Sequence, residues 1–407
     1  MSALEKYCAG YAEPEIHLLK DFAIGVHDNV LIVPTYRESP EFFYGFHQSL
    51  LFRQSVLLVL VINQPDNDLE KGPNQALFES IRAELSDPAE RGNLTYGCLP
   101  NCQSGILLVD RFSEHPLPPK EAVGLARKIG NDIAAELIRL KLVRYPVLFN
   151  TDADTQLPEN YFAAITDSSR PNSACIYPFK HDCDDSALGI ATQLYELRLQ
   201  HYVDGLQKAG SDFAFHTIGS TLAIDVNAYA MVRGFPKRAA GEDFYMLNKL
   251  AKVAPIISLD RPTLVIAARS SDRVPFGTGP AVNQLLGCQY PREEALFYHP
   301  STFAELGHSL KALADCPQSF EALREQGLSE PSLDALERIN IASFFNRLSA
   351  QHRKEPANQA AWQQFYARRL GDWFDAFKTL KFIHNLRDGY YPNINYQQLV
   401  LLNQQVR

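Results

Sequence analysis

Unbroken runs of apolar residues recur through the first 150 positions of the chain. They occupy residues 30–33, 56–62, 106–109 and 147–149, and each ends at a proline or a polar residue. A run without alternating polar positions is typical of a strand covered on both faces, as strands of a parallel sheet are. The pattern therefore predicts four buried strands.

Between the last two runs, residues 118–141 follow a different period. Apolar residues recur there at intervals of three and four, which predicts a helix: Val123, Ala126, Ile129, Ile133, Leu137 and Leu140. Strands alternating with helices favour a doubly wound α/β fold with a mainly parallel sheet flanked by helices. Ligands of such sheets bind at the carboxyl ends of the strands, and the stretch FNTDAD at 149–154 falls at such an end.

After about residue 300 the strand-like runs give way to helical spacing. Aromatic and aliphatic residues alternate at intervals of four and three: Tyr366, Leu370, Trp373, Phe377 and Leu380. We therefore predict an α/β domain over residues 1–300 and a helical C-terminal region over 301–407 packed on it. Basic residues beside these aromatics leave peripheral contact with an anionic membrane surface as the alternative: Arg368, Arg369, Lys378 and Lys381.

Composition narrows the classes of partner. A formal net charge of −8 and a pI of about 5.8 argue against binding along a nucleic-acid backbone, which needs clustered basic residues. The longest apolar run has seven residues, far below the ~20 that span a bilayer. The N-terminus has no basic head before an apolar stretch, so we expect a cytoplasmic protein. Seven scattered cysteines fit reduced thiols, and Cys98 and Cys102 are expected to be free rather than zinc ligands.

Two aspartates, Asp152 and Asp154, stand one residue apart directly after the fourth apolar run. Two ionised carboxylates this close repel each other unless a cation, hydrogen-bond donors or water offset the charge. The pattern therefore indicates that a cation or hydrogen-bond donors bind there, and the alternative is a solvated turn that caps the next helix.

Four motifs in order resemble the family 2 glycosyltransferases, which have a GT-A fold and transfer a sugar with inversion from a nucleotide diphosphate donor. They are VPTYRE at 33–38, GLARKIGNDIA at 124–134, NTDADTQLPENYF at 150–162 and GSTLAIDVNAYAMVRGFPKRAAGEDFYMLNKL at 219–250. The resemblance covers about residues 28 to 280 and makes the first 300 residues the nucleotide-sugar-binding and catalytic domain.

The resemblance implies a DxD site that uses Mn²⁺ or Mg²⁺. It makes Asp154 the direct metal ligand, while Asp152 holds the donor ribose or the metal through water. Such a cation acts as a Lewis acid on the leaving diphosphate. One or two carboxylates plus the phosphates of the donor are its usual shell.

In the fourth motif the resemblance implies that Asp243 is the general base and that Glu242 positions the acceptor or the loop. Inverting transfer is a single displacement, so one carboxylate that takes the acceptor proton is sufficient. The alternative is that Asp243 is the N-cap of the following helix, where its charge would favour the helix dipole.

The remaining candidates match the donor-binding parts of the family. Pro34, Tyr36 and Glu38 match the nucleotide-base loop, and Arg127 with Lys128 matches a helix start that touches the nucleotide. The chain departs from the family at Asn63, where the family usually has Asp, and at Lys128, where it usually has Asn. Asn63 can both donate and accept hydrogen bonds and could read a different base edge, so the resemblance does not fix the base of the donor as the family's usual uridine.

Two further segments carry candidate ligands. Arg269 and Arg273 lie in a glycine-containing loop at 268–282 that either closes over the diphosphate or is a plain surface turn. His216 precedes Gly219 and Ser220, which match the sugar-pocket strand of the family. His216 either touches the donor or acceptor or is a core histidine.

The predicted partners are a nucleotide diphosphate sugar and an acceptor that is a glycan, a lipid-linked species or a small molecule. Two other readings stay open: a nucleotidyltransferase-like enzyme, and a catalytically inactive nucleotide-binding scaffold of the same fold. The nucleotidyltransferase normally needs a glycine-rich basic loop after the first strand, and VPTYRESPEFF has neither glycine nor lysine.

Overall fold

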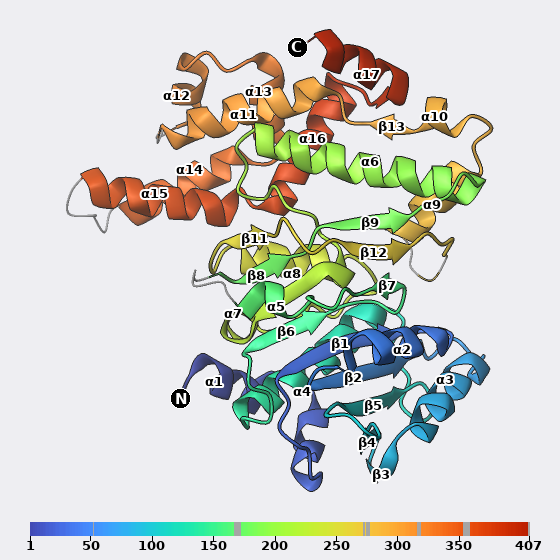
Figure 1. Cartoon of the computed structure of the whole chain (residues 1–407). Helices are drawn as coiled ribbons and strands as arrows, with labels where there is room; N and C mark the ends of the chain where they lie inside the picture. Colours follow the sequence, from blue (N-terminus) through green and yellow to red (C-terminus); the bar gives the residue numbers. More distant parts are fainter. Residues whose placement is uncertain are drawn as a thin grey trace. The chain divides into compact units, whose positions relative to one another are not determined.

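The computed structural model describes residues 1–51, 53–166, 172–271, 273, 277–315, 319–352 and 359–405 (Figure 1). The chain forms two compact units, each made of separate segments. The first consists of Met1–Gly189 and Thr217–Asn283, and the second of Ile190–His216 and Gln284–Arg407. The predicted boundary near residue 300 stays a prediction, because these units divide the chain at other points.

Four parallel strands form the centre of the first unit. They are β6 (Val147–Asn150), β1 (Asn29–Thr35), β2 (Val56–Asn63) and β5 (Gly105–Arg111), side by side in that order. Every residue of β1 and β2 is buried, and their register pairs Asn29 with Val56. All four predicted strands are therefore confirmed, and so is the α/β class with a mainly parallel sheet.

Five more strands extend this sheet, whose order is β11-β8-β10-β6-β1-β2-β5-β4-β3. On one side β4 (Leu94–Cys98) and β3 (Ser86–Arg91) follow β5 as antiparallel partners. On the other side β10 (Leu222–Asp225) runs antiparallel to β6, followed by β8 (Ala174–Ile176) and β11 (Ile256–Ser258). A small second sheet orders β7 (Thr155–Gln156), β12 (Leu264–Ala267) and β9 (Phe179–Asp182).

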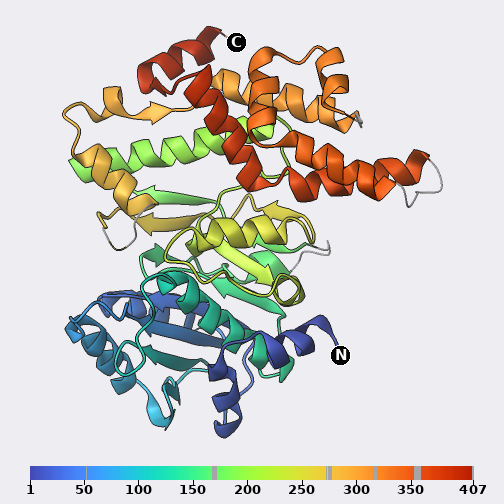
Figure 2. The same cartoon turned by 180° about the vertical axis from the view of Figure 1, so that it is seen from behind.

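Helix α4 (Ala122–Arg139) packs on β1 and β2, as the spacing of its apolar residues predicts. Viewed from behind, it crosses in front of the strands (Figure 2). The approach is close because Gly130 has no side chain: a Cβ there would lie 2.5 Å from Ile32 Cγ2. The other helices of this unit are α1 (Ala3–Gly10), α2 (Glu41–Phe46), α3 (Gly72–Ala83), α5 (Ala163–Thr166), α7 (Val226–Met231) and α8 (Glu242–Leu250). It also contains 3₁₀-helices at Pro14–Asp21 and Gly219–Thr221 and a π-helix at His47–Leu51.

The second unit is helical, which confirms the predicted C-terminal helical extension. Its helices are α6 (Ala187–Lys208, from its fourth residue), α10 (Pro291–Glu294), α11 (Pro300–Ala314), α12 (Phe320–Glu325), α13 (Glu330–Arg338), α14 (Ile341–His352), α15 (Gln359–Trp373), α16 (Ala376–Gly389) and α17 (Tyr396–Gln405), while α9 (Thr278–Leu286) spans the division between the units. Strands β13 (Leu296–Phe297) and β14 (Ile394–Asn395) pair antiparallel.

The predicted aromatic stripe is buried within this helical unit. Tyr366 and Trp373 belong to its core with Leu306, Leu336 and Phe382, and Leu370 packs against that core. Phe377 departs from the pattern because 36% of it is exposed. No helix in the described ranges is both long and apolar enough to cross a bilayer.

The buried centre of the sheet leads to a prediction about stability. Leu58 in β2 is fully buried, and Leu58→Ala should lower the free energy of unfolding by about 2–5 kcal/mol because it removes packed methyl groups and leaves a cavity. The control is Leu69→Ala, whose leucine is 88% exposed and should change stability by less than about 0.5 kcal/mol. Urea unfolding followed by circular dichroism measures both, and equal effects would contradict this assignment of the core.

Candidate active site

The two aspartates of the DxD motif leave the sheet at the carboxyl end of β6. The amide of Thr151 still donates to Ile32 O at 3.1 Å, and the amide of Thr155 then donates to Asp152 O at 3.2 Å to close a turn. The side chain of Asp152 is 32% exposed and that of Asp154 is 16% exposed. Both carboxylates therefore lie at the sheet edge where ligands of parallel sheets bind.

Arg127, from α4, joins this turn to the second carboxylate motif. Its Nη2 lies 2.7 Å from Asp152 Oδ1 and its Nε lies 2.8 Å from Glu242 Oε1, with only 4% of the side chain exposed. Burial alone would lower the pKa of Arg127, but Asp152 and Glu242 raise it above its ordinary value. Arg127 thus lies between these two carboxylates, and its predicted contact with the donor nucleotide stays a prediction.

Two details show how tightly the protein packs around the Arg127 guanidinium. A Cβ at Gly219 would lie 2.3 Å from Arg127 Nη2, so residue 219 must lack a side chain where it passes the guanidinium. The Nη1 atom is buried and has no hydrogen-bond partner within the described residues. A buried donor without a partner is costly, which marks Nη1 as a donor available to a bound ligand.

Glu242 and Asp243 open helix α8. The N-cap is Gly241, whose φ of 70° is a left-handed conformation that glycine adopts without strain. The alternative that Asp243 caps the helix is therefore wrong. Glu242 is buried against Arg127, whereas Asp243 is partly exposed and its Oδ1 accepts a hydrogen bond from the Phe244 amide at 2.6 Å.

The surroundings of Asp243 disfavour its charge. Asp243 is only partly exposed, and this loss of water together with the neighbouring Glu242 carboxylate raises the pKa of Asp243 to about 7, against the opposing effect of Arg127. A carboxyl group with a pKa near neutrality suits a general base, because about half of it is free of its proton at neutral pH and it is basic enough to accept one.

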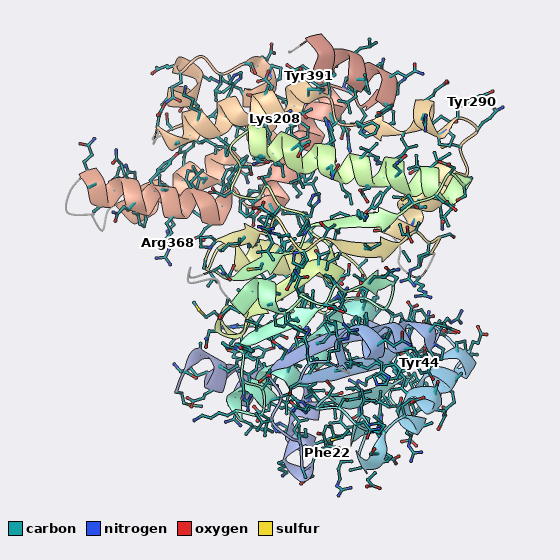
Figure 3. All side chains as sticks on the ribbon, viewed as in Figure 1. Phe22, Tyr44, Lys208, Tyr290, Arg368 and Tyr391 are labelled. Carbon is teal, nitrogen blue, oxygen red and sulfur yellow. The ribbon has the colours of Figure 1, made fainter. Side chains whose placement is uncertain are left out.

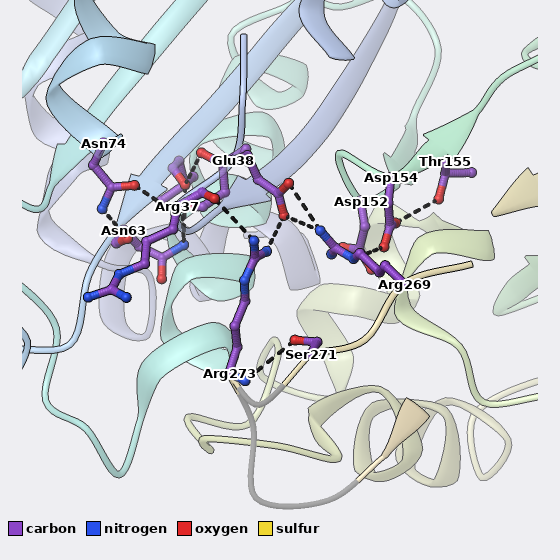
Figure 4. Close-up of polar contacts among 12 residues, drawn as sticks. Arg37, Glu38, Asn63, Asn74, Asp152, Asp154, Thr155, Arg269, Ser271 and Arg273 are labelled. Carbon is purple, nitrogen blue, oxygen red and sulfur yellow. Dashed lines mark hydrogen bonds and ion pairs between the residues drawn. The ribbon is translucent and has the colours of Figure 1, made fainter. Parts of the chain in front are cut away.

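Two arginines after β12 reach the same edge of the sheet (Figure 4). Arg269 Nε lies 2.7 Å from Asp154 Oδ2, and its Nη1 lies 2.8 Å from Glu38 Oε1. Arg273 also contacts Glu38 and donates from Nη2 to Arg37 O at 3.1 Å. The structure thus brings Glu38, Asp154 and both predicted arginines together, while residues 272 and 274–276 of the 268–282 loop lie outside the described residues.

These neighbours act in opposite directions on Asp154. Burial raises its pKa, Arg269 lowers it, and the carboxylates of Asp152 and Glu38 raise it, with a net value of about 6. Burial and the two neighbouring carboxylates therefore outweigh the effect of Arg269 on the pKa of Asp154.

The base-loop candidates lie at the ends of β1 and β2. Pro34 is within β1, and Tyr36 Oη donates to Asp68 Oδ2 at 2.7 Å. Asn63 Nδ2 donates to Thr35 O at 2.8 Å, so this side chain braces the two strand ends. Asp68 was not among the sequence candidates, although the polar stretch 63–75 after β2 contains it.

Arg37 and Asn74 were also missed. Arg37 forms a two-point contact with Asp68, from Nε at 3.0 Å and Nη2 at 2.7 Å, and its amide donates to Asn74 Oδ1 at 2.8 Å. Both hold the loop that follows β1. Arg37 lies inside the VPTYRE motif and Asn74 lies in α3, well beyond the end of β2, so neither position alone reveals that they meet.

Lys128 does not contact the carboxylates of the candidate site, which are those of the DxD turn and of the Glu242–Asp243 pair. Its Nζ lies 2.9 Å from Tyr7 Oη, 2.9 Å from Tyr11 O and 2.6 Å from Asp132 Oδ2. Successive residues of a helix point about 100° apart, so Arg127 and Lys128 serve different surroundings. Of the sugar-pocket candidates, Gly219 and Ser220 belong to the first unit and are buried, and His216 belongs to the second unit.

The two DxD carboxylates fit a hard divalent cation. Each has one oxygen in an ion pair, Asp152 with Arg127 and Asp154 with Arg269, and within the described residues the other oxygen has none. In the same residues no group of three or more His, Cys, Asp or Glu side chains is arranged to hold a metal. The carboxylate oxygens outside these ion pairs are hard ligands, and Mg²⁺ or Mn²⁺ bound by them would complete its shell with ligand phosphates and water.

No family model and no curated protein matches the chain. Among solved structures it is similar to S. aureus TarS 1–349 in complex with UDP-GlcNAc, at 13% identity over 85% of this chain and 91% of that one, with a TM-score of 0.36. The mannosyltransferase PcManGT from Pyrobaculum calidifontis with GDP-Man and Mn²⁺ matches at 15% identity over 95% of each chain, TM-score 0.36. GalNAc-T7 with UDP, GalNAc and Mn²⁺ matches at 11% over 90% of this chain and 58% of that one, TM-score 0.36. Likeness at this level carries no conclusion about activity.

The bridge made by Arg127 predicts a large loss of stability when it is removed. Arg127→Met keeps the apolar stem but leaves Asp152 and Glu242 without their cation, so the free energy of unfolding should fall by about 3–5 kcal/mol. The control is Arg82→Met in α3, which breaks an exposed pair with Glu90 and should cost less than about 1 kcal/mol. Urea unfolding distinguishes them, and a small loss for both would show that the bridge does not hold the site together.

Proposed function

We propose that this protein is a metal-dependent inverting glycosyltransferase that transfers a sugar from a nucleotide diphosphate to an acceptor hydroxyl. The observation that carries the proposal is the Arg127 bridge, because it joins the DxD turn and the Glu242–Asp243 pair into one site. These two motifs lie far apart in the sequence and have different chemistry. One supplies oxygen ligands for a cation, and the other supplies a carboxylate with a pKa suited to proton transfer.

On the donor side, the residues of the chain bind and orient the diphosphate. Arg127 offers the unpartnered Nη1, and Arg269 and Arg273 are held at the same edge by Glu38. Arginine forms two-point hydrogen bonds with phosphate, so these side chains can exchange Glu38 for the diphosphate. A divalent cation bound at Asp154 and Asp152 would add Lewis-acid neutralisation of the leaving charge.

On the acceptor side, Asp243 takes the proton. The acceptor oxygen forms its bond to the anomeric carbon while the bond from that carbon to the diphosphate oxygen breaks, and the hydroxyl proton passes to Asp243. The Phe244 amide occupies Oδ1 and so orients the carboxylate with Oδ2 available. Glu242 is buried against Arg127 and acts as a positioning residue for this pair.

The metal assignment predicts a specific defect for Asp154→Ala. UDP and GDP should each be tested by calorimetry with and without Mn²⁺, and the wild-type protein should bind at least one of them more tightly with Mn²⁺. The mutant should lose most of that Mn²⁺ dependence because a carboxylate oxygen ligand is gone. The control is Asp28→Ala, which removes an exposed carboxylate just before the opposite end of β1 and should leave binding unchanged. Unchanged Mn²⁺ dependence in Asp154→Ala would refute the metal site.

The base assignment predicts that Asp243→Asn binds donor but does not turn it over. Asparagine keeps the shape but cannot accept the proton, so the rate should fall by roughly 10²-fold to 10⁴-fold while calorimetric donor affinity persists. The wild-type kcat/KM should rise with pH through about 7, because Asp243 is active only after it has lost its proton. Release of the nucleoside diphosphate measures the rate. A near-normal rate in the mutant would point to Glu242 or His216 instead.

A further inference from the structure

A pocket of about 380 Å³ lies within the helical unit, among α14, α15 and the start of α16. Phe344, Leu348 and Trp373 form its apolar walls. Trp373 is 92% buried, and its Nε1 donor has no hydrogen-bond partner within the described residues. Since an unmet buried donor costs free energy, the pocket is suited to a ligand that brings a hydrogen-bond acceptor.

Three cations line the same pocket, and within the described residues none of them pairs with a carboxylate. Arg347 donates to Ser343 on its own helix, and Arg369 lies over the Phe365 ring at 5.3 Å. Lys378 lies 4.6 Å from the centre of the Trp373 ring and donates to Ile339 O at 2.9 Å. Their donors are thus only partly used.

The carboxylates of the pocket do not balance these cations. Asp375 is the N-cap of α16 and accepts from the Lys378 amide at 3.1 Å, so its charge already serves the helix terminus. Asp372 is the second carboxylate. Each of the two helices carries a further cation one turn away. On α15 it is Arg368, four residues before Asp372, and on α16 it is Lys381, three residues after Lys378.

The effect of this charge is visible at Lys378. Burial lowers its pKa, Asp375 opposes the change, and Lys381 and Arg347 lower the pKa further. The cations around the pocket therefore repel one another, and a bound anion would relieve that repulsion.

We propose that this pocket binds the phosphate of an anionic lipid headgroup and so holds the helical unit at a membrane surface. A soluble phosphate would interact with the cations and leave the apolar walls without a partner. A phospholipid has a phosphate for the cations and apolar groups for the walls. Phe377 is exposed beside Lys381, whose Nζ lies 4.5 Å from its ring centre, and Arg368 projects away from α15 (Figure 3). With a net charge of −8, the chain needs such a local basic surface to approach an anionic membrane.

The test is sedimentation of the full chain with vesicles of phosphatidylcholine alone or with 30% phosphatidylglycerol. The wild-type protein should bind only the anionic vesicles, and less at high salt. The double variant Arg347→Gln/Arg369→Gln removes two pocket cations and should lower the partition coefficient roughly 30-fold. The matched control, Lys311→Gln/Arg324→Gln, removes two exposed cations of α11 and α12 outside the pocket and should stay within about twofold of wild type.

A second measurement reports on the pocket itself. The chain has two tryptophans, so Trp362→Phe leaves Trp373 as its single indole. Its fluorescence should change when anionic vesicles are added and should not change with phosphatidylcholine alone. Inorganic phosphate serves as the soluble probe. A response to phosphate without vesicle binding would overturn the lipid source. Equal losses in both double variants, or no vesicle binding by the wild type, would overturn the site.

Discussion

One buried ion pair network determines how the candidate active site is assembled. Arg127 is almost completely withdrawn from water, so its charge must be matched inside the protein, and Asp152 does so at Nη2 and Glu242 at Nε. This requirement fixes the end of β6 relative to the start of α8. It also explains Gly219, since any side chain there would displace the guanidinium. Asp154 stands two residues after Asp152 and Asp243 stands one residue after Glu242, so their positions follow from the same constraint.

Around this buried pair lies a second, more exposed layer of charge. Arg269 and Arg273 contact Glu38 and Asp154 at the ends of the strands, where water partly screens them. Exposed pairs contribute little to stability, whereas a buried pair is costly to break. The inner layer is thus suited to hold geometry and the outer layer is suited to change partners when a ligand arrives. The sheet supplies the platform, because parallel strands end at one edge.

Much of this fold was predictable because its signals are local. The unbroken apolar runs of β1, β2, β5 and β6 identified the sheet core, and the spacing within α4 identified its helix. The DxD turn and the Glu242–Asp243 pair were recognised as motifs. The sequence did not reveal contacts between side chains that lie far apart along the chain. Lys128 stands next to Arg127 in the sequence but contacts Tyr7 and Asp132, and Asp68 was missed because nothing in its own neighbourhood shows that Tyr36 and Arg37 reach it.

The helical unit is discontinuous in sequence, and this has a consequence for synthesis on the ribosome. Helix α6 is made before β10 and α8, yet its Leu206 shares a core with Phe303 and with Leu386 near the end of the chain. At roughly 5–20 residues per second, α6 must wait on the order of ten seconds for the last of these partners. The part of α6 that packs in this core lacks those partners during that time, so a chaperone that covers α6 would protect the nascent chain from aggregation.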